Sequence, residues 1–136
     1  MTTIHKMRRL AEHRERMARI ELAQAELDRV AQQEVVDDTS GRMQEALQAP
    51  SPAIEDHVHR HAYALRMEMA RRGAERRLMD RQRDVSNRRD ALGLASREKG
   101  QLGKLIELRD EQLRHEAGRR EQRFLDEAGM QSWWRS

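Results

Sequence analysis

Cysteine is absent from the 136 residues, so the chain has no disulfide framework and no thiolate ligand for a metal. Aromatic residues are scarce as well: two tryptophans, one tyrosine and one phenylalanine. Apolar residues make up 37% of the chain and charged residues 38%, whereas a globular domain has about 45–50% apolar and about 25% charged residues. This composition excludes a thick core and favours a narrow apolar seam between solvated helices.

Long apolar runs are also missing. No stretch approaches the roughly 18 apolar residues of a membrane span, and the first residues lack the apolar region of a secretory signal. The charges are a dense mixture, with 27 basic and 24 acidic residues and a net charge of +3. Such mixing is typical of helices laced by ion pairs at i,i+4. We expect a cytoplasmic protein without membrane insertion that acts through its surface.

Proline occurs only at positions 50 and 52, and the residue before each proline avoids helical dihedral angles. Ser51 is a suitable cap for a following helix, with Pro52 at its first position. Gly129 is a natural end for that helix, and Asp37–Gly41 is a candidate break in the preceding one. We predict a single coiled-coil domain, 1–136, with a helix over about 4–48, a turn at 49–52, a second helix over about 53–128 and a tail at 129–136.

Apolar residues recur in both predicted helices at intervals of three, four and seven, which marks one helical face. In the first helix they are Leu10, Met17, Ile20, Leu27 and Ala31, flanked by Ala23, Val30 and Val35. In the second they are Ile54, Val58, Leu65, Met69, Leu78, Val85, Leu92, Leu102, Ile106, Leu113, Ala117 and Phe124. Folding back at the prolines pairs Leu10 with Leu92, Met17 with Val85, Ala23 with Met79 and Val35 with Met67. The fold class is therefore all-α, an antiparallel two-helix coiled-coil hairpin.

The second predicted helix is longer than the first and protrudes from the hairpin. The register places Ile4 opposite Glu98, so roughly 30 residues, ~45 Å at 1.5 Å per residue, run on without a partner in the chain. This overhang contains Leu102, Leu105, Ile106, Leu108, Leu113, Phe124 and Leu125. An unpaired helix with so many large apolar side chains predicts a contact site for another protein, on a chain that is a monomer when free.

Two stretches resemble a known family. Residues 7–27 are similar to the family's first helix, and Arg120–Glu127 is similar to its C-terminal pattern. That pattern is Glu-Gln-Lys, two variable residues and Asp-Glu, and here Arg123 stands where the family has Lys. Arginine keeps the charge but not the geometry of lysine. On these residues the chain resembles the stalk proteins of type III secretion, called FliJ in flagella and SctO or YscO in injectisomes.

The resemblance implies a non-enzymatic stalk or adaptor of a bacterial export apparatus, located in the cytoplasm at the periphery of the inner-membrane machinery. It implies insertion into a hexameric export ATPase, and links to the export gate and to secretion chaperones. It does not distinguish a flagellum from an injectisome. The side chains expected to contact the ATPase ring are Arg109, Leu113, Arg114, Arg119, Arg120, Arg123, Phe124, Asp126 and Glu127.

Eight arginines and three acidic residues lie between positions 71 and 89, a local net charge of +5. One interpretation is a solvated coiled-coil face whose arginines bond to Glu12, Glu15, Glu21 and Glu26. Others are an acidic protein partner or nucleic-acid phosphates, because guanidinium groups bind both carboxylate and phosphate. Nucleic acid is less favoured, since no aromatic residue interleaves the arginines. The candidate second partner surface is Arg72, Arg76, Arg77, Arg81 and Arg83.

The remaining signals are weaker. His57 and His61 share a helical face, but His59 points away and no third ligand is well placed, so no metal or other cofactor is expected. Trp133 and Trp134 are a candidate anchor for a partner, or alternatively a tail that folds back or stays disordered. No catalytic constellation is present, and we expect no enzymatic activity.

Two other functions compete with the export stalk. The first is a self-associating structural coiled coil in which the overhang pairs with a second copy. The second is an arginine-rich coiled coil that binds nucleic acid, with an affinity that falls steeply with salt. The oligomeric state separates the first from a stalk, and binding at low salt separates the second.

Overall fold

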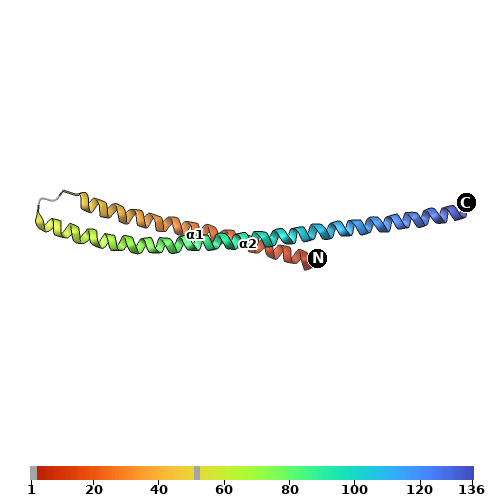
Figure 1. Cartoon of the computed structure of the whole chain (residues 1–136), viewed down its shortest axis with the longest axis horizontal. Helices are drawn as coiled ribbons and strands as arrows, with labels where there is room; N and C mark the ends of the chain where they lie inside the picture. The colour runs from red at the N-terminus through yellow and green to blue at the C-terminus, as the bar shows by residue number, and fades with distance from the viewer. Residues whose placement is uncertain (1–2, 51–52) are drawn as a thin grey trace. The chain divides into compact units, whose positions relative to one another are not determined.

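The computed structural model describes residues 3–50 and 53–136, which form two helices (Figure 1). Helix α1 is Thr3–Gln48, with 46 residues, and helix α2 is Ile54–Arg135, with 82 residues. Within the described ranges there is no strand. The predicted all-α hairpin with a longer second helix is confirmed. The predicted helix cap at Ser51 and Pro52 lies outside the described residues.

Ion pairs one turn apart stabilise both helices along their surfaces. The pairs join Arg8 with Glu12 at 3.3 Å, Arg19 with Glu15 at 2.8 Å, Arg42 with Asp38 at 3.3 Å and Arg88 with Asp84 at 3.5 Å. Each such pair contributes roughly 0.3–0.5 kcal/mol to a helix. These pairs add to the stability of helices that bury few apolar groups.

The candidate break at residues 37–41 does not occur, and α1 is continuous there. The Thr39 hydroxyl donates to the Val35 carbonyl oxygen at 2.7 Å, one turn earlier. Gly41 keeps a negative φ angle, so its backbone stays helical. The Arg42–Asp38 ion pair also spans this stretch. Local hydrogen bonding of Thr39 is therefore directed back into the helix and does not interrupt it.

Tertiary contacts divide the chain into two compact units, each of which contains part of both helices. One unit is residues 15–94, where Val36 of α1 packs with Ala74 and Leu78 of α2. The other is residues 1–14 with 95–136, where Arg14 Nη1 lies 3.0 Å from Glu98 Oε1. In the first unit the later part of α1 therefore meets the earlier part of α2, and in the second the start of α1 meets the later part of α2. This is the pairing that antiparallel helices require.

The buried positions of each helix alternate at spacings of three and four, the pattern of a two-stranded coiled coil. In α1 the buried or half-buried positions that follow this spacing are Ala11, Glu15, Ala18, Leu22, Ala25, Arg29, Gln32, Val36, Thr39, Met43 and Ala46. In α2 those that follow it, with one gap of seven residues between Leu78 and Val85, are Arg60, Ala64, Met67, Arg71, Ala74, Leu78, Val85, Arg88, Leu92, Ala95, Lys99, Leu102, Ile106 and Arg109. We call these two rows the seam. It is rich in alanine, which lets two helices approach closely.

The predicted face of α1 is wrong by one residue. Leu10, Met17 and Leu27 are 50%, 42% and 65% exposed, whereas Ala11, next to Leu10, and Ala25, two residues before Leu27, are 1% and 3% exposed. One residue turns a helix by about 100°. The prediction followed the largest apolar side chains, but the closest approach of the helices selects the smallest ones. Large apolar residues of α1 then lie on the flanks of the seam.

The α2 face was predicted correctly in part. Leu78 and Val85 are buried as expected. The first four positions of the predicted face are wrong, because they are largely exposed: Ile54, Val58, Leu65 and Met69. Here too a smaller side chain takes the buried position, since Ala64 is 6% exposed beside Leu65 at 65%.

The predicted register is also wrong. Val35 was expected beside Met67, but its neighbour Val36 packs with Ala74 and Leu78, about two turns further along α2. The prediction assumed that the two helices end level at the turn. Figure 1 shows α2 beginning beyond the end of α1, which displaces every cross-helix pair in the same direction. Gln32 fixes the observed register, because its Nε2 donates to the Ala74 carbonyl oxygen at 3.0 Å.

The shifted register shortens the overhang. Leu102 and Ile106 were assigned to it, but they are 9% and 5% exposed and belong to the seam. From residue 111 to residue 135 every side chain of α2 is exposed. We call residues 111–135 the C-terminal segment.

The end of α2 was predicted too early. The helix does not stop near residue 128 but continues through Gly129 to Arg135. Gly129 has no positive φ, so it does not act as a cap. The helix ends at Arg135, and the hydroxyl of the following Ser136 donates to the Trp133 carbonyl oxygen at 2.9 Å. A single glycine inside a helix costs only up to about 1 kcal/mol relative to alanine.

At the turn, α2 supplies the cation that α1 lacks. The last turn of α1 has no basic residue, although its free carbonyl groups carry partial negative charge. The Arg60 guanidinium donates to the carbonyl oxygens of Ala49 and Pro50, the latter at 2.7 Å. Arg60 therefore joins the start of α2 to the chain just after α1.

Candidate partner-binding surface

The predicted ATPase contacts lie on the C-terminal segment, except Arg109, which is half-buried at the end of the seam. The large apolar members stand out from the helix, with Leu113 53% and Phe124 69% exposed. Eleven residues separate them, which is about three turns, so they share nearly the same face. All the charged members on the segment are exposed: Arg114, Arg119, Arg120, Arg123, Asp126 and Glu127.

The charges of the C-terminal segment are not paired with one another. Within residues 111–135, all of which the structure describes, no side chain forms an ion pair. The one side-chain hydrogen bond between charged or amide groups of the segment runs from Gln122 Nε2 to Asp126 Oδ1, at 3.1 Å. The arginine side chains and Glu127 are therefore available to a partner.

The two tryptophans are not in a tail, because they belong to the last turns of α2. Their rings meet edge to face, with centroids 5.3 Å apart and planes at 82°. They line a shallow hollow over Gly129 together with Leu125, Asp126 and Met130. Sequence reasoning missed Leu125 and Met130 as members of this group. The signal was the spacing of four residues from Leu125 to Gly129 to Trp133.

The arginines between 71 and 89 divide into three groups. Arg88 Nη1 bonds to Glu21 Oε2 at 2.9 Å and Arg89 Nη2 to Glu26 Oε1 at 3.5 Å, across the seam. Arg71 and Arg72 bond to acids on their own helix. The remaining four form no ion pair among the described residues and are exposed: Arg76, Arg77, Arg81 and Arg83. Pairing with the facing arm thus accounts for only part of the cluster. Glu12 and Glu15, expected to join it, pair instead within α1.

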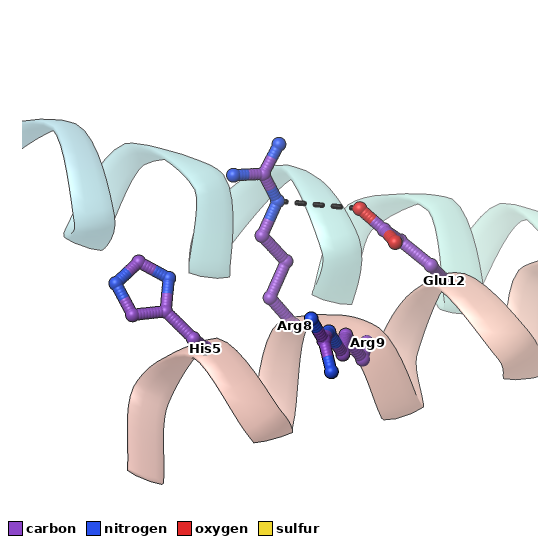
Figure 2. A pocket seen from close by; sticks show the side chains of 4 residues that line it. All are labelled: His5, Arg8, Arg9 and Glu12. Atoms are coloured by element: carbon purple, nitrogen blue, oxygen red, sulfur yellow. Dashed lines mark ion pairs between the residues drawn. The ribbon is translucent and has the colours of Figure 1, made fainter. Parts of the chain in front are cut away.

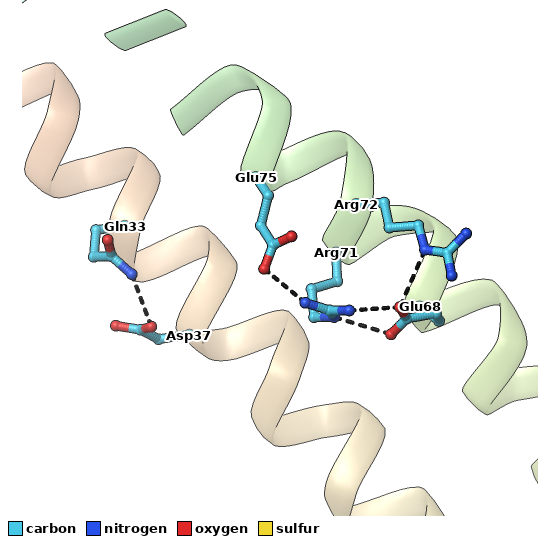
Figure 3. Close-up of polar contacts among 6 residues, drawn as sticks. All are labelled: Gln33, Asp37, Glu68, Arg71, Arg72 and Glu75. Carbon is cyan, nitrogen blue, oxygen red and sulfur yellow. Dashed lines mark hydrogen bonds and ion pairs between the residues drawn. The ribbon is translucent and has the colours of Figure 1, made fainter. Parts of the chain in front are cut away.

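Glu68 is the centre of the strongest polar network (Figure 3). It accepts hydrogen bonds from Arg71 and, at 3.2 Å, from Arg72 Nε. Arg71 Nη1 also donates to Glu75 at 2.6 Å. Hydrogen bonds from Arg71 lower the pKa of the Glu68 carboxyl, and the same contact raises the pKa of Arg71. The network holds the Arg71 side chain at its seam position.

The histidines lie at the turn. His57 and His61 line a small hollow with Ala46, Leu47 and Arg60. Nowhere in the described ranges do three or more histidine or acidic residues come together as metal ligands. The hollow therefore contains two imidazoles and one guanidinium that is already bonded to carbonyl oxygens.

A second basic hollow lies on the first turns of α1 (Figure 2). It is lined by His5, Arg8, Arg9 and Glu12. The Arg8 Nε atom lies 3.3 Å from Glu12 Oε1, and Arg9 forms no ion pair within the part of the chain that the structure describes. The sequence analysis did not single out this hollow, because no motif distinguishes it from the many charged helical faces of the chain.

Comparison with known proteins now identifies the family. No helix in the described ranges is long and apolar enough to cross a membrane. No curated protein and no solved structure matches the chain. A family model described as "Flagellar FliJ protein" matches residues 1–136. That family is a structural component associated with flagellar type III export, and is not a known enzyme. The match confirms the resemblance: the chain belongs to the flagellar FliJ protein family.

Proposed function

We propose that this protein is the stalk of the flagellar export ATPase, and that the C-terminal segment enters the centre of the hexameric ring. The observation that supports this most directly is the segment itself. It is 25 residues of continuous helix in which every side chain is exposed. Most of the stability of helices in proteins comes from packing against another element, so a helix that offers unpaired charges and large apolar groups without such packing is suited to a partner.

The two kinds of exposed side chain have different roles in this proposal. Leu113 and Phe124 are the apolar anchors, because apolar burial supplies most of the affinity of a helix in a groove. Arg114, Arg119, Arg120, Arg123, Asp126 and Glu127 contact the charged inner loops of the ring, with Arg109 at the start of the contact. Charge complementarity would set the depth and orientation of insertion. Trp133 and Trp134, beyond these residues, are a further candidate anchor.

The proposed mechanism is mechanical and allosteric. One helix cannot present the same face to six subunits, so each subunit meets a different part of it. A contact shifts a conformational equilibrium only when its affinity differs between the states. Asymmetric contacts with the C-terminal segment would therefore favour different nucleotide states in different subunits and would raise turnover.

The family also suggests partners beyond the ATPase. We propose that the protein works in the cytoplasm at the periphery of the inner-membrane apparatus, where it links the ATPase to the export gate and to secretion chaperones. The hairpin, rather than the C-terminal segment, is then the part left outside the ring for these contacts.

ATP turnover by the purified export ATPase tests the proposal. Wild-type protein should stimulate turnover, and the double variant L113S/F124S should lose most of this stimulation. The matched control is I54S/L65S, which also removes two exposed apolar side chains from α2, 82% and 65% exposed, but far from the segment. Equal stimulation by all three proteins would contradict the proposed contact.

Self-association is the competing function for the same surface. Light scattering of the pure protein should show a monomer. A tight dimer that L113S/F124S converts to monomer would mean that a second copy, and not the ATPase, covers the C-terminal segment.

A further inference from the structure

A row of exposed arginines on α2 forms no ion pair within the described chain. We call Arg76, Arg77, Arg81 and Arg83 the arginine stripe. All four are exposed, and none forms an ion pair, whereas their neighbours Arg71, Arg72, Arg88 and Arg89 all do. One helix thus contains two populations of arginine within 19 residues, and only one of them is explained by the fold.

No acid of α1 forms an ion pair with the stripe among the described residues, and this includes Glu34, which is exposed. Glu21 and Glu26 are bonded to Arg88 and Arg89. Asp28 and Asp37 accept hydrogen bonds from glutamines of their own helix, at 3.1 and 3.0 Å. On α2, Asp84 is bonded to Arg88, which leaves Asp80 as the one acid among the stripe residues. The stripe therefore keeps a net positive charge.

The stripe also has a regular geometry. Arg76 and Arg83 are seven residues apart, about two turns and ~10 Å along the axis, and they lie opposite the buried seam residues Leu78 and Val85. Arg77 and Arg81 are one turn apart and line a shallow hollow with Asp80 and Asp84. Arg76 and Arg83 therefore share one face of α2 at a spacing that a second helix can match, whereas Arg77 and Arg81 lie on an adjoining face nearer to the seam.

We propose that Arg76 and Arg83, on the solvent face of the arginine stripe, dock an acidic helical segment of another protein with carboxylates seven residues apart. Arginine binds carboxylate through two parallel hydrogen bonds, which suits a fixed helical spacing. This surface is separate from the C-terminal segment, so the contact goes beyond the proposed ATPase contact. One molecule can therefore bind the acidic segment and the ATPase at the same time.

The observations favour an acidic protein over nucleic acid. No aromatic residue lies between positions 64 and 123, so the stripe offers no ring for base stacking. Asp80 and Asp84 in the hollow would repel a continuous phosphate backbone, but in a protein interface they can accept hydrogen bonds from basic or amide groups. A mixed-charge partner helix therefore fits better than a polyanion.

Binding of a synthetic peptide to the full chain tests the proposal. The probe is a labelled, alanine-based helical peptide with glutamates at i, i+4 and i+7, and its control has glutamine at those positions. We expect measurable anisotropy binding of the glutamate peptide at low salt. The variant R76Q/R83Q should weaken it about tenfold or more, since each tenfold step needs only about 1.4 kcal/mol.

The matched control variant is R88Q/R89Q, which removes the same charge from the same helix but from arginines that are already paired. It should weaken peptide binding less than about threefold. Circular dichroism must show unchanged helix content in both variants. Equal loss in the two variants, equal binding of the glutamine peptide, or tighter binding of a single-stranded oligonucleotide that depends on Arg76 and Arg83 would each overturn the proposal.

Discussion

Two stretches of the same helix differ in what surrounds them. Residues 60–109 of α2 present a buried or half-buried side chain at nearly every third or fourth position, and several of their arginines are bonded. Residues 111–135 have a similar mixture of charge and large apolar groups, but every side chain is exposed. Composition therefore does not separate the two stretches. What differs is that the first stretch packs against α1. We therefore expect residues 60–109 to contribute to the stability of the fold and residues 111–135 to contact another protein.

The largest expected effect comes from the seam. The Leu78→Ala variant should lower the free energy of unfolding by about 2–4 kcal/mol, because it removes a buried side chain and leaves a cavity. Leu113→Ala, on the exposed stretch, should change it by less than about 0.5 kcal/mol. Urea denaturation followed by circular dichroism measures both. Similar losses in the two variants would mean that residue 113 is also packed in solution.

A smaller effect is expected at the contact that sets the register. Gln32→Ala removes the hydrogen bond to the Ala74 carbonyl oxygen and should cost about 1 kcal/mol. The neighbouring Gln33, which bonds only to Asp37 of its own helix, gives the control. If Gln33→Ala destabilises the hairpin as much as Gln32→Ala, the observed register is wrong.

Acid should weaken the paired stretch through Glu68. Hydrogen bonds from Arg71 lower the pKa of Glu68 in the folded chain. Desolvation opposes this by raising the pKa, and a hydrogen bond from Arg72 lowers it further. A lowered folded pKa means that the stabilisation is fully present above the ordinary value of 4.5 and is lost as the pH falls through the folded value. Thermal denaturation should show a stability decline below pH 4.5 that is smaller in Glu68→Gln. An identical pH profile in the variant would exclude Glu68 as a contributor.

The smallest effect should belong to the exposed ion pairs across the seam. A double-mutant cycle on Glu21 and Arg88, with glutamine at each position, should give a coupling of about 0.2–1 kcal/mol that decreases with salt. A coupling of several kcal/mol would show that the pair is shielded from solvent.

The sequence was sufficient for the two helices and the longer second one. Pro50 and Pro52 end one helix, and the period of the apolar residues extends on both sides of them. The sequence did not predict which residues form the seam. The prediction relied on large apolar side chains such as Leu10 and Met17, whereas the close approach of the two helices places small alanine side chains in the buried positions. The register could not be obtained, since it depends on how far α2 begins beyond α1. Gly129 misled the prediction because glycine permits an end to the helix without requiring one.

The candidate partner-binding surface was also predicted only in part. The exposed anchors Leu113 and Phe124 were identified because they lie beyond the reach of α1 under either register. Leu102 and Ile106 were misplaced because their assignment depended on the register itself. The division of the arginines into bonded and unbonded groups depends on which acids face them, and Glu21 and Glu26 could not be distinguished from Glu12 and Glu15 by sequence alone.

Amide hydrogen exchange on the full chain, with and without the hexameric export ATPase, tests the central claim most directly. Alone, residues 111–135 should exchange much faster than the seam residues, because their hydrogen bonds have no lateral packing. With the ATPase, exchange in residues 111–135 should slow about tenfold or more, while the seam remains unchanged. Protection that appears only in the hairpin, with residues 111–135 still exchanging fast, would contradict the account.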